Sequence, residues 1–552
     1  MREHAGACWR EALIGSTVLV RCSTICSVDL DELSASERRL WRAFPRGELV
    51  GLGSARGSAR NIRAEVIGAL LLGAVPPEPG CIAAVRLDGA RITGAVRLAH
   101  SQIPGPIRLR HCEFDSPVDL SGARVRDIDL DGARLAGLTA ALAEIGGNLS
   151  MIAGRCSGQI LLTGAHITGA LQLQRSLLDN PGRVAVPANR LVTDDGLLAQ
   201  QAVVNGEIRL AGAHIGGMTG LHGAVVRGGG RRAVNAFSLS VGASVFAGRG
   251  FSAEGEVVLS DARIEGNLDF RNAVLSNPGG DALTAHGVQV GGYLSLDGCS
   301  AHGATRLSRA KVGAELYLSG GRFINPGGDA VRCRNADARL LALDQDMVTD
   351  GTADLRLSRF AVIRDDPSCW PRQMRLSGAG YEALDPQLPA AERVQWLLRD
   401  IDGYLPQNYE TLAGLYRRHG DEAAARTVLL ARERRHRQEL PRYRQAWSWL
   451  QEITVGYGYR PLRAAAWLAA FLGTGTLVFG LHHPPPLSGA PHPAFNPLIY
   501  TLDLLVPLVD FGLRGGYDPQ GAQRWLAYLL IAVGWILVTT IAAGVARVLR
   551  RQ

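Results

Sequence analysis

The sequence predicts a mainly β protein in which a right-handed parallel β-helix lies between a helical N-terminal cap and a helical membrane tail. Three observations support this prediction. Apolar residues recur at a fixed interval of 48 or 49 residues, short apolar-alternating runs fill each interval, and long charge-free stretches appear near the C-terminus. A single coil cannot bury its apolar side chains, so stacked coils share one interior.

The long interval is marked by a recurring loop. The string Asn-Pro-Gly occurs in 180–186, 277–283 and 325–331, and the Gly-rich stretch 227–234 fills the gap between the first two. Three apolar series keep steps of 48, 49 and 48 residues: Val186, Val234, Leu283 and Val331; Leu173, Leu221, Phe270 and Leu318; and Leu162, Leu210, Leu259 and Leu307. We expect the loops to emerge from one side, once per two coils.

A finer period of five or six residues runs through the upstream part, typical of a pentapeptide-like solenoid. It places these residues in register: Ile92, Leu98, Ile103, Leu109, Phe114, Leu120, Val125, Leu130 and Leu135. The runs between turns are too short for helices and predict strands. Such short steps disfavour a sandwich or a propeller, whose blades need four longer strands. The sequence therefore predicts coils of roughly 20–22 residues over 81–380.

Residues 29–80 are predicted to form a helical cap on the first coil. Ser34 and Glu37 have the spacing of a capping box, and Ile62, Val66 and Leu70 follow at helical spacing. Open ends of a solenoid have to be covered, which gives these helices a role. Residues 1–28 show no clear periodicity and are interpreted as a disordered extension.

The segment 386–450 is predicted to be a helical hairpin followed by a basic juxtamembrane stretch. Its apolar residues have helical spacing on both sides of a Gly420-Asp421 turn: Tyr409, Leu412, Leu415 and Tyr416, then Ala425, Val428 and Leu429. A run of arginines follows: Arg432, Arg434, Arg435, Arg437, Arg442 and Arg444. This run is either a solvated helix face or a surface for anionic lipid, from which each basic residue gains about 1 kcal/mol.

Residues 451–552 are predicted to form a membrane domain with spans at about 464–481 and 525–546, joined by the loop 482–524. Basic residues flank the outer ends of this pair: Arg460, Arg463, Arg547, Arg550 and Arg551. The loop holds only Arg514 and Arg524. The positive-inside rule then places both termini and the solenoid on the cytoplasmic side of the plasma membrane.

Two features near the spans bear on ion conduction. Residues 454–458 read TVGYG, the potassium-filter string, but they precede the first span, and a filter has to lie between spans. Between the spans, 495–519 is semi-apolar and carries Asp503 and Asp510. If this segment re-enters the bilayer, its carboxylates form a cation-attracting ring in an oligomer; otherwise it lies on the outer surface with both carboxylates in water.

Several segments resemble one family. "LWRAFPRGE", "IRAEVIGALLLG", "DIDGYLPQNYETLAGLYRRHG", "VGYGYRPLRAAAWL" and "FNPLIYTLDLLVPLVDFG" are similar to an actinobacterial, streptomycete-type family of membrane-associated proteins. Its members are often named "membrane-associated oxidoreductase". The C-terminal part also resembles the two-span membrane tail of some pentapeptide-repeat proteins, which is similar to two-helix ion channels. The resemblance supplies no catalytic residues.

The residues themselves predict no catalytic, cofactor or metal site. Lys311 is the single lysine and does not lie in a phosphate loop, and residues 51–57 miss the dinucleotide pattern by one residue. Nine cysteines include no CxxC pair, so we expect isolated buried thiols. His166 and His214 are 48 residues apart, which predicts one face; a repeated turn residue or a metal site would both explain them.

The sequence thus favours a non-enzymatic, membrane-anchored solenoid that acts as a binding or scaffold protein. The expected partners are the lipid bilayer and a protein, either another protein or a second copy, and no nucleic acid, because a net charge of +8 is modest for 552 residues. No cofactor is expected. A channel-like oligomer with a two-span pore and, by family name alone, an oxidoreductase are the alternatives.

Overall fold

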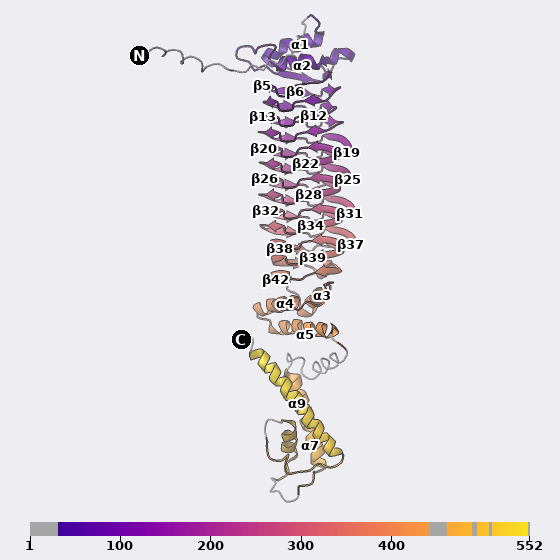
Figure 1. The fold of residues 1–552 in the computed structure, drawn as a ribbon, viewed down its shortest axis with the longest axis vertical. Helices are drawn as coiled ribbons and strands as arrows, with labels where there is room; N and C mark the ends of the chain where they lie inside the picture. The colour runs from indigo at the N-terminus through magenta and orange to yellow at the C-terminus, as the bar shows by residue number, and fades with distance from the viewer. Residues whose placement is uncertain (1–30, 440, 442–460, 488–493, 507–509, 550–552) are drawn as a thin grey trace, which may run out of the picture. The chain divides into compact units, whose positions relative to one another are not determined.

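The computed structural model describes residues 31–439, 441, 461–487, 494–506 and 510–549, in two compact units, Met1–Gly351 and Thr352–Gln552. The chain forms a parallel β-solenoid of about 14 turns flanked by N- and C-terminal helices (Figure 1). The predicted solenoid and its helical flanks are confirmed. The predictions on residues 1–28, on Arg442 and Arg444, on the TVGYG string, and on the flanking arginines Arg460, Arg550 and Arg551 lie outside the described residues.

Each coil of the first unit supplies strands to four sides, and each strand pairs in parallel with the strands one coil before and after it. On the first side, for example, Ile107 lies opposite Val85 and Ile128. The strands of this side are β1 (Val50–Gly51), β3 (Val85–Asp88), β6 (Ile107–Arg110), β10 (Ile128–Asp129), β14 (Leu149–Ser150), β18 (Leu171–Gln172), β21 (Leu197–Leu198), β24 (Thr219–Gly220), β27 (Val245–Phe246), β30 (Leu268–Asp269), β33 (Leu294–Ser295) and β36 (Glu315–Tyr317).

The fourth side has the same construction. Its strands are β5 (Gln102–Ile103), β9 (Arg124–Val125), β13 (Glu144–Ile145), β17 (His166–Ile167), β20 (Val192–Thr193), β23 (His214–Ile215), β26 (Ser240–Val241), β29 (Arg263–Ile264), β32 (Gln289–Val290) and β35 (Lys311–Val312). One longer strand, β38 (Asp337–Leu343), pairs with strands of both the fourth and the first side. Side chains alternate inward and outward along each strand, which fixes what every side exposes.

The second and third sides change along the molecule. Early coils have separate strands, β2 (Asn61–Arg63), β4 (Arg91–Thr93), β7 (Glu113–Phe114), β11 (Arg134–Leu135) and β15 (Arg155–Cys156) on the second side, and β8 (Val118–Asp119), β12 (Leu138–Thr139) and β16 (Ile160–Leu161) on the third. Later coils join both sides in one strand: β19 (Leu177–Pro187), β22 (Val203–Arg209), β25 (Val225–Asn235), β28 (Ser252–Val258), β31 (Val274–Thr284), β34 (Ser300–Arg306), β37 (Arg322–Arg332) and β39 (Val348–Asp354).

These joined strands explain the interval of 48 or 49 residues. Strands of 11 residues (β19, β25, β31 and β37) alternate with strands of 7 residues (β22, β28 and β34). In register, Leu171 lies opposite Leu197, an advance of 26 residues, and Leu197 lies opposite Thr219, an advance of 22. The repeating unit is therefore two coils, and the four extra residues are the predicted loop.

The predicted interior is confirmed residue by residue. All nine upstream residues from Ile92 to Leu135 are buried, as are all members of the three long series except the half-buried Leu221. Part of the glycine content is explained by the corners of the coils, where the chain turns from one side of the solenoid to the next. Gly164 and Leu142 both have positive φ, +67° and +57°, and a Cβ on Gly164 would lie 2.8 Å from the Leu142 Cδ2. At this corner, glycine leaves room for the Leu142 side chain of the preceding coil.

The N-terminal cap contains two α-helices, α1 (Ala35–Ala43) and α2 (Ala64–Leu71). The predicted capping box is present, because the Ser34 side chain accepts from the Glu37 amide while the Glu37 carboxylate accepts from the Ser34 amide. Glu37 is buried and also accepts from the Arg63 Nε at 2.9 Å. Burial alone would raise the pKa of Glu37, but the bonds from Arg63 and the backbone hold it below its ordinary value.

The cap differs from the sequence prediction in one respect, because it is not purely helical. Two short 3₁₀ helices, η1 (Phe44–Arg46) and η2 (Gly57–Arg60), connect its parts, and β1 and β2 pair with β3 and β4. The cap therefore continues the hydrogen-bonded ladders of the first coil. This continuation leaves fewer unpaired backbone groups at the open end, where a strand edge invites pairing with other chains.

The second unit begins with the last strands of the solenoid, where β39 pairs with β41 (Gln373–Arg375) and β40 (Arg359–Asp365) pairs with β42 (Gly380–Asp385). The short helix η3 (Pro367–Cys369) follows β40, and the last residue of β40 forms a buried ion pair in which the Arg393 Nη1 lies 2.6 Å from the Asp365 Oδ2. The Trp370 indole donates to the same carboxylate at 2.8 Å. Removing either charge would leave the other buried and unpaired, which costs about 3–5 kcal/mol.

Three helices come next, α3 (Ala390–Leu397), α4 (Pro406–Arg418) and α5 (Glu422–Glu439). Helices α4 and α5 form the predicted hairpin, with Gly420 at φ +78° between them. The predicted apolar residues of both helices are buried. The tail contains α7 (Pro461–Leu481), α8 (Pro497–Leu505) and α9 (Ala522–Leu549), which pack on one another around Phe479, Tyr500 and Leu530.

The structure supports the prediction of two membrane-spanning helices only in part. Among the described residues, only α9 is long and apolar enough to cross a membrane, within Ala522–Thr539. The other candidate, Ala466–Leu481, is a shorter apolar helix. Helix α8 approaches α9 closely, since a Cβ on Gly534 would lie 2.1 Å from the Leu505 carbonyl oxygen. The tail is thus a packed group of three helices.

Candidate functional site

One outward column on the second side changes its chemistry along the first unit. In the early coils this column consists of charged residues in direct register: Arg91, Glu113, Arg134 and Arg155. From β19 onward the same column is uncharged, and we call these residues the uncharged strip: Leu177, Val203, Val225, Ser252, Val274 and Ser300. Charge returns at Arg322. The strip spans six coils, about 24 Å at the usual strand spacing.

Beside the strip stands a row of four loops, which we call the loop row: 180–183, 228–231, 277–280 and 325–328. Three of them share one lock, in which an Asn side chain donates to the carbonyl oxygen four residues later. Asn180 bonds to Val184, Asn277 to Asp281 and Asn325 to Asp329, at 2.8 to 2.9 Å. Pro followed by a Gly of positive φ forms the turn itself.

Each loop packs against a glycine of the following short strand. Gly303 has φ +123°, and a Cβ there would lie 2.6 Å from the Asn277 carbonyl oxygen and 2.8 Å from that of Gly280. Gly206, Gly255 and Gly351 occupy the same place at steps of 49, 48 and 48 residues and share the positive φ. This series was not predicted from the sequence, although its interval equals that of the loops and would have revealed it.

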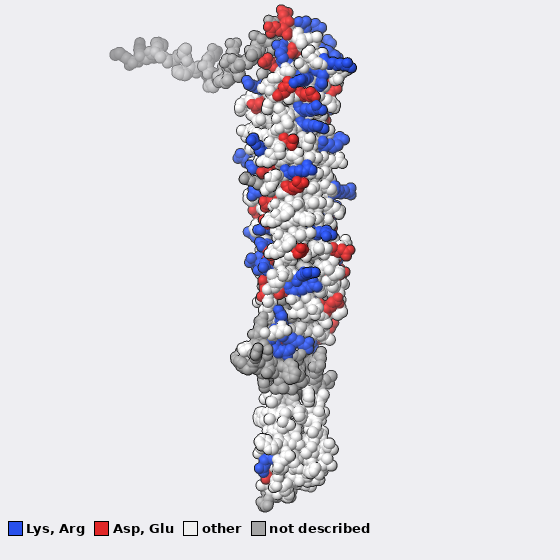
Figure 2. All heavy atoms as spheres, turned by 90° about the vertical axis from the view of Figure 1, so that its right-hand side faces the viewer, with Lys and Arg blue, Asp and Glu red and all other residues white. Residues whose placement is uncertain are grey.

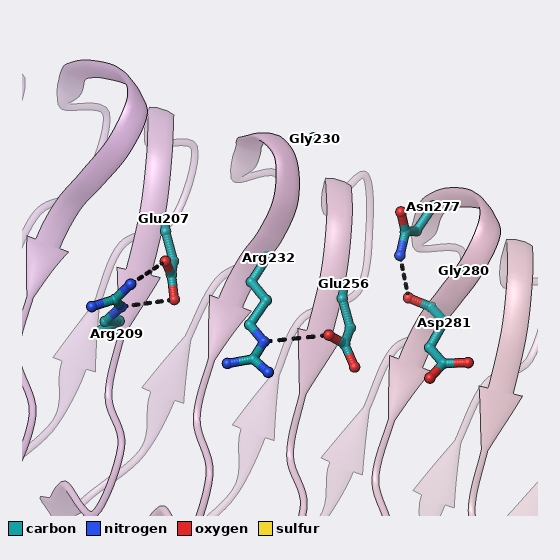
Figure 3. Close-up of a pocket in the computed structure, with 8 residues that line it drawn as sticks. All are labelled: Glu207, Arg209, Gly230, Arg232, Glu256, Asn277, Gly280 and Asp281. Atoms are coloured by element: carbon teal, nitrogen blue, oxygen red, sulfur yellow. Dashed lines mark hydrogen bonds and ion pairs between the residues drawn. The ribbon is translucent and has the colours of Figure 1, made fainter.

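Under the loops lies a cleft of about 490 Å³ (Figure 3). Its lining residues are Glu207, Arg209, Gly230, Arg232, Glu256, Asn277, Gly280 and Asp281. The charges are matched: Arg209 pairs with Glu207 at 2.9 Å, Arg232 with Glu256 at 3.3 Å, and Asp281 with Arg306 at 2.7 Å. Every acid of the lining thus has an arginine partner, although Arg306 itself lies outside the lining.

The molecular surface also shows the difference between the early coils with the charged column and the later coils with the uncharged strip. Figure 2 looks onto the side of the molecule that lies at the right in Figure 1, where the loops project. Charged side chains crowd the N-terminal coils, whereas broader uncharged areas lie over the coils that bear loops. Val274 of the strip is 42% exposed, which leaves an apolar side chain open to solvent beside the loop row. We call the strip and the loop row together the docking face.

The two predicted pore carboxylates have different environments. Asp503 is 2% exposed, and its carboxylate accepts from the backbone amides of Phe511, Leu513 and Arg514 at 2.8 to 3.1 Å. Asp510 is exposed and accepts from the Gly512 amide at 2.8 Å. Asp503 therefore holds the chain after α8, a role that local sequence does not reveal because its partners are eight to eleven residues away.

The predicted lipid-facing arginines of α5 are described in part. Arg432 forms ion pairs with Glu410 of α4 and with Glu433, so it joins the two helices of the hairpin. Arg435 donates to the Gln438 side chain at 2.8 Å. Arg434 and Arg437 lie on the same helix and also have interaction partners. The described part of the basic run is thus engaged in interactions of its own chain.

The histidine prediction is confirmed as a shared face. His166 and His214 lie in one register column of the fourth side, with Val192 between them. His166 contacts Asp194 at 3.0 Å. Across the residues that the structure describes, no group of three or more His, Cys, Asp or Glu side chains is placed to hold a metal ion.

The cysteine prediction holds for five of the six cysteines that the structure describes. Cys112, Cys156, Cys299, Cys333 and Cys369 are buried, while Cys81 is exposed. Burial raises the pKa of the Cys112 and Cys299 thiols to about 12. Thiols of such high pKa react slowly, because the thiolate is the nucleophile.

Fold and surface together define a β-solenoid protein with a C-terminal apolar helix. No protein-family model matches the chain, and no curated protein matches it. The resemblance to a family of membrane-associated proteins, and the oxidoreductase activity that its usual name implies, therefore remain predictions. The function of this chain has to be inferred from its own geometry.

Proposed function

We propose that this protein is a membrane-anchored scaffold whose docking face binds a protein partner. The observation that carries the proposal is the change of one outward column from charged residues to the uncharged strip, at the coil where the loop row begins. The solenoid interior does not require this change, since inward residues are apolar on both sides of it. An uncharged, half-exposed strip beside rigid loops is typical of a protein-binding surface.

The balance of charge on the docking face favours protein over nucleic acid. Binding to phosphates depends on basic residues that neutralise them. Two arginines under the loop row already have acidic partners, Arg209 with Glu207 and Arg232 with Glu256, and the loops add only Arg183 and Arg231. A partner surface that is itself largely uncharged would fit this face without breaking those pairs.

The tail supplies the anchor in this proposal. Helix α9 spans 28 residues, about 42 Å at 1.5 Å per residue, which exceeds the roughly 30 Å hydrocarbon core. We infer that α7 crosses beside it as a second span, because the two helices pack together and α7 has 21 residues. By the positive-inside rule, the arginines that flank the two spans in the sequence favour a cytoplasmic position for the solenoid at the plasma membrane, and we infer that its coils are right-handed.

Site-specific photo-cross-linking tests the proposal directly. A photoreactive amino acid is placed at Val225 or at Val274 of the full chain in native membranes, with Arg134 of the charged column as the matched control. We expect adducts of higher mass from both strip positions and none from Arg134. Equal adduct formation at all three positions, or none at Val225 and Val274, would contradict the proposal.

A channel-like oligomer is the second candidate, favoured by one observation in the tail. The short helix α8 packs against both α7 and α9, as a re-entrant segment between two spans would. Reconstituted protein would then carry a cation current that falls in Asp510→Asn. Asp510 is the sharper choice, because Asp503→Asn also disturbs the loop that this buried carboxylate holds. The absence of current in wild-type vesicles would exclude this candidate.

A further inference from the structure

We infer that the N-terminal end of the solenoid binds a small amphiphile, a molecule with one long apolar chain and an anionic headgroup. The chain occupies an apolar cavity between the cap and the first coils, and the headgroup occupies an adjoining hollow that contains two arginines. Both belong to the early coils, so the inference does not rest on the docking face. It is carried by the lining of the two cavities, by their continuity and by one unpaired arginine.

The apolar cavity exists because the cap does not extend every side of the solenoid. Strands β1 and β2 continue the first and second sides, whereas the fourth side begins at β5. The segment 72–83 lies against that start, and the Ala84 amide ties its end to the Phe44 carbonyl oxygen at 3.2 Å. A Cβ on Gly105 would lie 2.2 Å from the Ala83 carbonyl oxygen, so the two segments touch there. Elsewhere this segment covers the strand less completely than a further coil would, and a cavity remains.

This cavity has the size and lining of a small-molecule site. Its volume is about 480 Å³, and the lining residues that the structure describes include no charged side chain. Phe44, Leu70 and Ile103 of the lining are buried, whereas Leu72 and Ile82 at its rim are 47% and 56% exposed. An apolar chain in the cavity would remove these rim side chains from water, which is favourable.

A second, polar hollow of about 680 Å³ adjoins the first on the fourth side. The two share three lining residues, Gln102, Ile103 and Pro104, so a ligand can extend from one into the other. The charged residues of this second lining are Arg124, Arg126 and Glu144, besides His166. Arg124 and Glu144 form an ion pair at 2.8 Å, which leaves the charge of Arg126 unbalanced within the lining.

Arg126 is available to a ligand. It is exposed, and its side chain forms no ion pair or hydrogen bond with any residue that the structure describes. The nearby acids are engaged elsewhere, since the Asp127 carboxylate accepts from the Asn148 amide at 3.0 Å and Asp194 contacts His166 at 3.0 Å. A guanidinium binds a carboxylate or a phosphate through two parallel hydrogen bonds. A charge-free cavity that leads to such a group fits an amphiphile with an anionic head.

Photolabelling of the full chain in nanodiscs, without detergent, tests the site. The probe is hexadecanoate with a diazirine at the end of its chain, and mass spectrometry of peptides locates the adducts. We expect saturable adducts on the segments 70–83 and 102–105. Unlabelled hexadecanoate and hexadecyl phosphate should displace the probe. Hexadecanol, which has no charge, should displace it about fivefold less well, and inorganic phosphate, which has no chain, should not displace it.

Two variants with matched controls separate the headgroup from the chain. Arg126→Gln should weaken hexadecanoate binding about fivefold and remove its advantage over hexadecanol, whereas Arg134→Gln should change neither. Ile82→Glu places a charge on the apolar rim and should abolish the saturable adducts. Leu49→Glu, at an exposed residue of the cap outside the lining, should leave them intact. Residues 82 and 49 are both exposed, so these two variants should fold.

Three results would overturn the inference. The first is equal displacement by hexadecanoate and hexadecanol in the wild-type chain, which would remove the role of the anionic head. The second is unchanged labelling in Ile82→Glu, which would place the probe outside the cavity. The third is the absence of saturable adducts on both segments, whether the cavity stays empty or is filled by a protein or by another part of this chain.

Discussion

The coils before β19 and the coils from β19 onward share one interior but have different exteriors. In both halves, inward residues such as Leu120 and Leu307 are buried, and strands pair in parallel from coil to coil. Outward, the first half has a column of charged residues that includes an Arg134–Glu113 pair, whereas the second half has the uncharged strip and the loop row. The inward residues set the fold, so the outward residues are free to create a binding surface.

The largest effect is expected at the glycines of positive φ that contact the loops, because only the second half of the solenoid has these loops. Gly303→Ala places a Cβ within 2.6 Å of the Asn277 carbonyl oxygen, at a φ that L-residues avoid. We expect the free energy of unfolding to fall by about 3 kcal/mol. Thermal unfolding of the full chain in detergent measures this change.

A glycine of the first half is the matched control. A Cβ on Gly137 meets nothing closer than 3.6 Å, and this residue does not have positive φ. Gly137→Ala should therefore change stability by less than about 0.5 kcal/mol. Equal losses in both variants would show that Gly303 does not seat a loop.

The next effect concerns the lock of each loop. Asn277→Ala removes the bond from the Asn277 side chain to the Asp281 carbonyl oxygen, and Asn325→Ala removes its equivalent. Each should cost about 1 kcal/mol, and the double variant about twice that, because the two loops are two coils apart. Chemical unfolding of the single and double variants gives both values; a strongly non-additive result would indicate that the loops act as one unit.

The free energy of unfolding should depend on pH through a buried carboxylate of the second half. The expected change is smaller than that from removing the Asn bond of a loop and larger than that from removing an exposed ion pair. Burial alone would raise the pKa of Asp269, but the bonds from Arg271 hold it below its ordinary value. Its stabilising contribution is thus present above the unfolded pKa and is lost as the pH falls below about 4. Unfolding between pH 3 and 7 should show a shallower dependence in Asp269→Asn; an unchanged slope would contradict this account.

The smallest effect is expected in the charged column. Arg134 and Glu113 form an exposed ion pair at 3.2 Å. Arg134→Ala should change the free energy of unfolding by less than about 0.5 kcal/mol, because water screens such pairs. High salt should reduce the difference between wild type and variant further, because it screens exposed charges. A loss above about 1 kcal/mol, the upper end for exposed pairs, would assign this column a structural role that the strip does not have.

The sequence predicted what depends on periodicity. The interval of 48 or 49 residues predicted the stacked coils and the loops once per two coils, because each series reports the same inward position. Ser34 and Glu37 predicted the first helix through a local rule. Tyr409 and Leu412, with their neighbours, predicted the hairpin of α4 and α5.

The sequence did not reveal the features that depend on contacts between residues far apart in the chain. Asp503 suggested a pore lining, but its carboxylate bonds to amides eight to eleven residues later, after a chain reversal that no local pattern reports. The seating role of Gly303 requires knowing that a loop of the preceding coil packs against it. The charge-free stretch 464–481 is barely long enough for a span, and the structure has a shorter apolar helix there, Ala466–Leu481. Sequence reasoning thus described the repeat better than the contacts between repeats.

The most direct test of the docking face is thiol accessibility in native membranes. Cys is placed at Val274 or at Arg134 of the full chain, and the rate of labelling by a membrane-impermeant maleimide is measured in opened vesicles, then again after dilution in detergent. Both sites are exposed in the single chain. The account predicts slow labelling at 274 in membranes that becomes fast on dilution, with fast labelling at 134 throughout. Fast labelling at 274 in undisturbed membranes would contradict it.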